Sequence, residues 1–207
     1  VATCELPAIR PLDQSAAAVN EVRARIAAGS TYDDAFEENG GKVYFNNKDL
    51  IMDHNPNRVV GLRFASVGVP MGATIKSASV HLTSRGHHNG ELHMDIYADA
   101  SGAPRRLQTT YHDLSSRDRT NATVEWNTEV HRAGGQVYES PDIAAVIAEV
   151  TSKPEWREGN DIVIMMSKTP GTGGSGGRYP WAGDGAIADS DAPLLVVDFD
   201  RREPQAV

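Results

Sequence analysis

The strongest constraint on the fold is a series of short segments in which polar and apolar residues alternate. Residues 77–83 have the sequence Ser-Ala-Ser-Val-His-Leu-Thr, and residues 91–97 have Glu-Leu-His-Met-Asp-Ile-Tyr. Successive side chains of a β-strand point to opposite faces, so this alternation predicts two half-buried strands. The stretch 85–90, with its two glycines, separates them and predicts a hairpin. The apolar face of this hairpin would consist of Ala78, Val80, Leu82, Leu92, Met94 and Ile96.

Other short apolar segments predict further strands. They lie at 42–45, 49–52, 59–64, 161–166 and 194–199. One helix is predicted after Ser140, which would cap it, with Pro141 at the first helical position. Many short strands with a single helix are typical of β-sandwiches. We therefore expect an all-β sandwich over residues 31–200, with one short crossover helix.

The N-terminal region has a different pattern. Residues 13–29 predict a helix that Asp13 caps and Gly29 ends. Val19, Val22 and Ile26 recur at three- and four-residue spacing and form a narrow apolar stripe. This stripe could dock on the β domain or on another copy of the chain. The expected organisation is an N-terminal helical extension at 1–30, the sandwich at 31–200 and a tail at 201–207.

Composition limits the class of protein. Of the 207 residues, 40% are hydrophobic, which suffices for one globular core. No run of 18 apolar residues is present, so no membrane span is expected. The net charge is −8 and no Lys/Arg cluster exceeds two residues, which argues against a nucleic-acid partner.

Cysteine usage and the chain start suggest an extracellular setting. Cys4 is the single cysteine, so an internal disulfide is impossible. Cys4 could be an incidental or intermolecular thiol, or a lipidation site. The chain begins without Met, as secreted proteins do after signal-peptide removal. We expect a secreted or cell-surface protein.

Four segments in order carry a resemblance to a known family. They are 60–64 with 69–75, 116–126, 140–156, and 192–197. Together they resemble a jelly-roll module that recurs in secreted bacterial proteins and is similar to carbohydrate-binding modules. The resemblance implies a jelly-roll fold, an extracellular location and binding without catalysis.

The resemblance also implies a structural calcium ion. In carbohydrate-binding jelly rolls such an ion often lies between an acidic first strand and an acidic residue of the last strand. Here the candidate ligands are Asp33, Asp34, Glu37, Glu38 and Asp198. Calcium takes six to eight oxygen ligands, of which carboxylates could supply several. The alternative is that these acids belong to a solvated surface.

The best ligand-contact candidates lie beside a glycine-rich loop. They are Arg178, Tyr179, Trp181 and Asp184. Sugars stack on exposed aromatic rings, while charged groups bind their hydroxyls. Aromatic residues make up only 6% of the chain, so two of them two positions apart form a local concentration. The alternative is that both rings fill the rim of the sandwich.

No catalytic constellation is evident. The run 173–177 has a serine between glycines, but Arg178-Tyr179-Pro180 does not provide the helix that a hydrolase nucleophile needs. No spacing among the acids singles out a glycosidase pair. The leading hypothesis is a non-enzymatic module that binds an extracellular polysaccharide or cell-surface glycan. The alternative is a structural subunit of an extracellular filament or surface layer that self-associates through residues 1–30.

Overall fold

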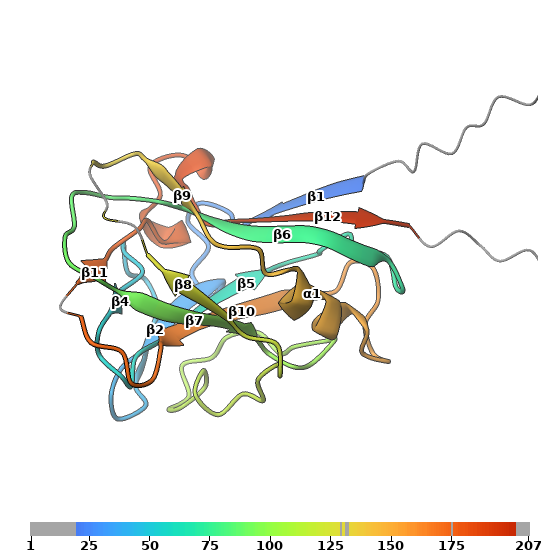
Figure 1. Cartoon of the computed structure of the whole chain (residues 1–207), viewed down its shortest axis with the longest axis horizontal. Helices are drawn as coiled ribbons and strands as arrows, with labels where there is room; N and C mark the ends of the chain where they lie inside the picture. Colours follow the sequence, from blue (N-terminus) through green and yellow to red (C-terminus); the bar gives the residue numbers. More distant parts are fainter. Residues whose placement is uncertain (1–19, 129, 131–132, 175, 202–207) are drawn as a thin grey trace, which may run out of the picture.

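Two antiparallel β-sheets face each other across a shared apolar core in the computed structural model, which describes residues 20–128, 130, 133–174 and 176–201 (Figure 1). The four-stranded sheet has the order β1 (Asn20–Arg25), β12 (Leu194–Asp200), β6 (Thr74–Thr83) and β9 (Val137–Glu139). The six-stranded sheet has the order β3 (Val43–Tyr44), β2 (Asp34–Glu37), β5 (Val59–Phe64), β10 (Ile162–Lys168), β7 (His93–Ala98) and β8 (Val124–Asn127). The chain therefore forms a predominantly β structure of sandwich type.

Smaller elements complete the fold. Strands β4 (Met52–Asp53) and β11 (Gly177–Arg178) form a two-stranded ladder, and two 3₁₀ turns, η1 (Gly183–Gly185) and η2 (Asp189–Asp191), precede β12. The helix α1 (Ala144–Thr151) connects β9 to β10 and lies between the two sheets at one edge (Figure 1). Across the described ranges, no helix combines the length and the apolar character that crossing a membrane requires.

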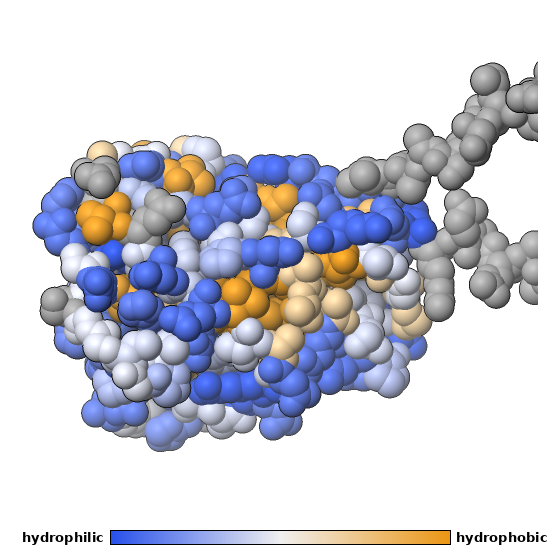
Figure 2. Space-filling model, in the orientation of Figure 1, coloured by the Kyte–Doolittle hydropathy of each residue, from blue (hydrophilic) through white to orange (hydrophobic). Residues whose placement is uncertain are grey.

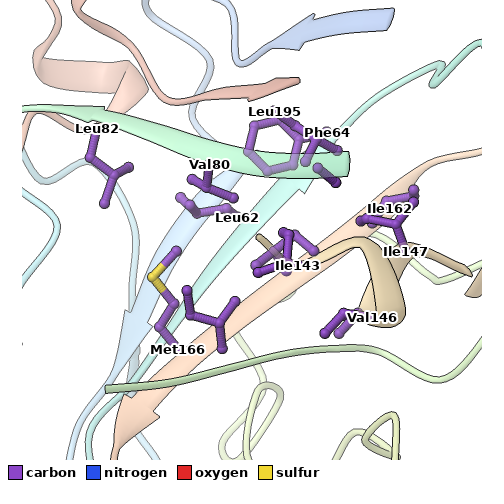
Figure 3. Packing of buried hydrophobic residues seen from close by; sticks show 14 of the residues in the cluster. Leu62, Phe64, Val80, Leu82, Ile143, Val146, Ile147, Ile162, Met166 and Leu195 are labelled. Carbon is purple, nitrogen blue, oxygen red and sulfur yellow. The ribbon is translucent and has the colours of Figure 1, made fainter. Parts of the chain in front are cut away.

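The main core forms from the alternating side chains of both sheets. Val80 and Leu82 of β6 and Leu195 of β12 point inward from one sheet, while Leu62 and Met166 point inward from the other (Figure 3). The helix contributes Val146, Ile147 and Val150, each with no exposed surface. Burying one such side chain stabilises the fold by about 1.5–3 kcal/mol. On the face in Figure 2, hydrophilic residues form most of the surface, and hydrophobic ones gather near its middle, beside α1.

A second apolar cluster lies on the outer face of the six-stranded sheet, under the segment 99–123. It contains Ala35, Val43, Val59, Tyr97, Leu107, Leu114, Val163 and Met165. Figure 1 shows this segment, in yellow-green, on the side of the sheet away from the four-stranded sheet. Strand β10 is therefore buried on both faces, which explains its continuous apolar sequence.

Buried charges hold the covering segment in place. The Arg117 guanidinium donates to Asp99 at 2.8 Å and to Asp113 at 3.0 Å. It also donates to the carbonyl oxygens of Arg105 and Arg106, both at 3.0 Å. Because a buried ion pair is favourable only when its remaining hydrogen bonds are made, this complete set of partners is what allows Arg117 to be buried.

The predicted hairpin of 77–83 and 91–97 is wrong, although both strands exist. Strand β6 pairs with β12 and β9, whereas β7 pairs with β10 and β8. The stretch between them passes from one sheet to the other, so their apolar faces meet across the core. Alternation identified the buried face of each strand, but it carries no information about which strand is the neighbour.

The predicted N-terminal helix is wrong over residues 20–25, where the structure has β1. Residues 26–29 are not helical either, and residues 13–19, including Asp13 and Val19, lie outside the described residues. Within β1 the polar and apolar residues alternate, and Val22 and Ala24 pack against the core while Glu21 and Arg23 are exposed. This period of two fits a strand and not a helix. The strand forms because the segment pairs from Asn20 to Arg25 with the edge of β12. The sandwich thus includes residues that the sequence assigned to an extension.

The crossover helix begins later than predicted. It starts at Ala144, and the Ser140 hydroxyl accepts a hydrogen bond from the Val80 N–H at 3.0 Å in place of capping the helix. The Asp142 carboxylate accepts from the Ala144 N–H at 2.9 Å. The Ser140 hydroxyl thereby provides an acceptor for the buried Val80 N–H, which would otherwise lack one.

Candidate functional site

A short extended segment, 179–182, positions the most favourable candidate site. It lies between residues 48–50 and the end of β6, with hydrogen bonds on both sides. The Trp181 N–H donates to the Thr83 carbonyl at 2.9 Å, and the Leu50 N–H donates to the Pro180 carbonyl at 3.0 Å. This pairing fixes the backbone from which the side chains of Tyr179 and Trp181 project.

Trp181 forms one part of the site together with an ion pair. The guanidinium carbon of Arg85 lies 4.9 Å from the centroid of the Trp181 ring, which is a cation–π distance. The Arg85 Nη1 donates to both carboxylate oxygens of Asp49, at 2.7 and 2.5 Å. This carboxylate raises the pKa of Arg85, so the guanidinium stays charged. The Arg85 side chain is 40% exposed and can therefore contact a ligand.

Tyr179 forms the other part, against His88. Their ring centroids are 4.8 Å apart and the planes are inclined at 48°. Burial, with smaller contributions from Arg178 and His87, lowers the pKa of His88, against an opposing effect of Asp49. Burial therefore favours the neutral form of this imidazole.

Several of these groups line a cavity of about 410 Å³ at one end of the sandwich, whereas Trp181 is linked to it through its contact with Arg85. The cavity is lined by Asp49, Arg85, Gly86, His88 and Tyr179. The Tyr179 ring provides apolar surface for the C–H face of a sugar, and the charged pair of Arg85 and Asp49 provides groups for its hydroxyls. The cavity volume lies at the lower end of the range of small-ligand pockets.

The other two predicted contact residues lie elsewhere. Arg178 has no exposed surface, and its guanidinium donates to the carbonyl oxygens of Gly90 at 2.9 Å and Thr128 at 3.0 Å. It therefore holds the turn 86–90 in place instead of facing a ligand. Asp184 lies in η1 and does not line the cavity; burial raises its pKa, which hydrogen bonds from Asn46 and Thr31 partly offset.

Sequence reasoning missed Asp49, Arg85 and His88 as members of this site. Arg85 and Asp49 are 36 residues apart, and each is an ordinary surface residue by type. Residues 85–90, which contain Arg85 and His88, were predicted only as the turn of a hairpin. The pairing of 179–182 with both 48–50 and 83–85 is what brings these residues together.

The five acids of the predicted calcium site do not converge. Four of them belong to β2 or its flanks in the six-stranded sheet, whereas Asp198 is in β12 of the other sheet and accepts from the Ser77 hydroxyl at 2.9 Å. Within β2, Asp34 faces the core and Glu37 faces outward, since they are three positions apart.

Each of the remaining acids is held by a partner within the protein. Asp33 pairs with Arg63, and Glu38 pairs with Arg58 at 3.1 Å. Over the residues that the structure describes, no three His, Cys, Asp or Glu side chains come together to hold a metal ion. This donor set does not fit a cation that takes six to eight oxygens.

Comparisons with known proteins add little to this picture. No family model matches the chain, and no curated protein matches it. Among solved structures, the chain is similar to one from "Structure of infectious bursal disease virus Gx strain", with 15% identity and a TM-score of 0.26. The alignment covers 95% of this chain and 41% of that chain, so the present chain spans about two-fifths of that protein's length.

Proposed function

We propose that this protein is a non-catalytic, extracellular module of jelly-roll type that binds a polysaccharide or cell-surface glycan in the end cavity. The observation that carries the proposal is the arrangement of Tyr179, Trp181 and Arg85. An aromatic residue in a β-sandwich normally contributes to the core, as Trp126 and Trp156 do here, with exposures of 5% and 0%. Trp181 and Tyr179 instead remain partly exposed; Tyr179 lines the cavity, and Trp181 contacts Arg85, which lines it as well.

The position of the cavity supports binding by an end-on approach. It lies at the Thr83 end of β6, whereas the described chain ends, Asn20 and Asp200, meet at the Thr74 end. Ten residues of a strand span roughly 30 Å.

The chemistry of the cavity supports binding without hydrolysis. Glycosidic hydrolysis needs two carboxyl groups at a fixed separation. Asp49 is the single acid that lines the described cavity, and Arg85 engages both of its oxygens. The proposal includes no calcium ion, because the five candidate ligands lie on two different sheets and do not converge on one site.

The alternative of a filament subunit has lost part of its support. In that alternative, Val22 and Ile26 would form an interface with another copy of the chain. In the structure they pack in or against the protein's own core. Light scattering distinguishes the two functions: a filament subunit forms large species at micromolar concentration, and a binding module stays monomeric.

A glycan array tests the binding proposal directly. The wild type should bind a defined group of polysaccharides, and Trp181→Ala and Tyr179→Ala should each weaken binding by at least about tenfold. Tyr111→Ala is the matched control, because Tyr111 is 64% exposed and is not among the residues lining the cavity. If both site variants bind as the wild type does, while circular dichroism shows them folded, the proposed site is wrong.

A further inference from the structure

A second cavity lies on the outer face of the six-stranded sheet, at the edge of the covering segment 99–123. It has a volume of about 300 Å³. Its lining includes six charged or polar residues, Glu37, Glu38, His112, Ser115, Arg119 and Lys168. Its floor follows a row across the strands, in which Glu37 pairs with Val59 and Val59 with Ser167. We call this cavity the sheet groove; it is distinct from the end cavity, with which it shares no lining residue.

The negative charges of the sheet groove are already engaged. The Glu37 carboxylate, 2% exposed, accepts from the N–H groups of Leu114 at 2.9 Å and Ser115 at 3.0 Å. Glu38 pairs with Arg58 at 3.1 Å. Both carboxylates are therefore held by partners within the protein.

The positive charges of the groove lack such partners. The guanidinium carbon of Arg119 lies 4.3 Å from the centroid of the Tyr97 ring, which holds the group without neutralising it. The Lys168 ammonium donates to the Thr172 carbonyl at 2.5 Å, which leaves two further donors. Among the described residues, neither cation forms an ion pair with a carboxylate. For a chain of net charge −8, two cations that line one cavity without forming an ion pair are a departure from the overall pattern.

The wall of the groove is built rigidly. His112 has a φ of 63°, in the left-handed region, and its N–H donates to the Gly41 carbonyl at 2.6 Å. A Cβ atom on Gly41 would lie 2.3 Å from the imidazole Nε2, so only glycine allows the ring to occupy this position. The imidazole Nδ1 lies 3.6 Å from a Glu37 oxygen and 3.3 Å from the Ser115 hydroxyl. A strained residue that its surroundings hold in place is a recurring feature of binding sites.

We propose that the sheet groove binds an anionic substituent of a polysaccharide, with Arg119 and Lys168 as its direct contacts and His112 as a further donor. A guanidinium matches the two oxygens of a carboxylate or sulfate with a pair of parallel hydrogen bonds, and an ammonium adds a point charge. The inference rests on the proposed function only in taking the ligand to be a glycan. It adds a second contact region and a charge preference, so that the end cavity would bind the sugar rings and the groove a charged group.

Nuclear magnetic resonance with defined sugars tests this proposal by location. Trigalacturonate should shift the amide signals of Ser115, Arg119 and Lys168, whereas its neutral methyl ester should not. Arg119→Gln with Lys168→Gln should raise the Kd for trigalacturonate by at least about tenfold. Lys76→Gln is the matched control, because Lys76 is 52% exposed and lies on β6 in the other sheet.

Further ligands identify the source of the anion. Further variants distinguish a failure of the groove proposal from a failure of the proposed function. Sulfated dextran oligosaccharides that give the same shifts extend the groove to sulfate esters, whereas equal shifts with inorganic sulfate alone overturn a glycan ligand. Shifts confined to the end cavity, or equal binding of the methyl ester, overturn the groove and leave the proposed function intact. Groove shifts that persist in Trp181→Ala support the groove independently of the end cavity.

Discussion

The carboxyl group of Asp34 accepts a hydrogen bond from the backbone N–H of Gly183 at 2.7 Å, across 149 residues of sequence. Asp34 points into the sandwich from β2 and is 2% exposed. This contact joins the six-stranded sheet to the η1 turn that precedes the last strand. Burial raises the pKa of Asp34 to about 7; the Gly183 hydrogen bond opposes the shift, and Asp184 and Asp33 add to it.

The first prediction concerns the pH dependence of stability. Between pH 3.8 and about 7 the folded protein binds more protons at Asp34 than the unfolded chain does. The contribution of Asp34 to the free energy of unfolding therefore falls as the pH rises through this window, and the loss persists above it. Asp34→Asn should remove this loss and raise the stability at pH 8 by an amount on the order of a few kcal/mol.

Urea unfolding at a series of pH values measures this effect. The difference between wild type and Asp34→Asn should grow from pH 4 to pH 7 and then stay constant. Asp198→Asn serves as the control, because Asp198 lies in the other sheet, bonded to Ser77. A difference that is independent of pH would show that folding does not raise the pKa of Asp34.

The second prediction concerns Arg117, which holds the covering segment. Arg117→Ala leaves Asp99 buried without its cation and leaves Asp113 with the Arg105 cation alone, and removing one partner of a buried pair typically costs about 3–5 kcal/mol. Chemical denaturation should show this loss, or separate unfolding of residues 99–123. Arg157→Ala is the control, because Arg157 is exposed and its recorded hydrogen bonds are to nearby carbonyls. Equal stability of the two variants would contradict a structural role for Arg117.

The third prediction tests whether β1 belongs to the sandwich. Ile26, 2% exposed, follows β1 and packs in the main core, so Ile26→Ala should destabilise the protein by about 2–5 kcal/mol. Arg23→Ala should change the stability little, because the Arg23 side chain is 51% exposed. Thermal unfolding of both variants gives the comparison. A mobile N-terminal extension would leave the Tm unchanged by either substitution.

The fourth prediction concerns calcium. Since the five candidate acids are distributed over two sheets and hold other partners, millimolar calcium should leave the Tm within about 1 °C of its value in EDTA. Magnesium provides the matched control for ionic strength and charge. A rise of several degrees that is specific to calcium would reveal a site that these carboxylates do not account for.

The fifth prediction uses tryptophan fluorescence. Trp126 and Trp156 are buried, whereas Trp181 is partly exposed, so acrylamide should quench Trp181 first. Trp181→Phe should remove most of the quenchable signal. A glycan that binds in the end cavity should protect the wild-type signal. Quenching that is the same in both proteins would place Trp181 away from solvent.

The strands were more predictable from the sequence than their partners. Alternation identified β6 and β7, because the pattern of a strand depends on its own burial. Their assignment to different sheets depends on long-range pairing with β12 and β10, which no local pattern encodes. At the N-terminus, the three- and four-residue spacing of Val19, Val22 and Ile26 masked the period of two in β1.

The candidate site was predictable in part, for a similar reason. The closeness of Tyr179 and Trp181 in sequence pointed to the segment that lies beside the end cavity. Arg178 has the residue type of a ligand contact, but the turn carbonyls that surround it are invisible in a sequence. Arg85 reaches Trp181 because the backbone of 179–182 runs beside the end of β6.

The pairing of β1 with β12 also determines how the domain responds to tension. Asn20 lies opposite Phe199 in an antiparallel pair, so a force pulling on Asn20 and Asp200 acts on adjacent points. The hydrogen bonds between the two strands would then open one after another, as in a zipper, and none would share the load with the next. Peeling of β1 would uncover Val22 and Ala24 and open the edge of β12. The domain should therefore yield at low force when pulled by its two ends and resist far more when the load enters through the far end of β6.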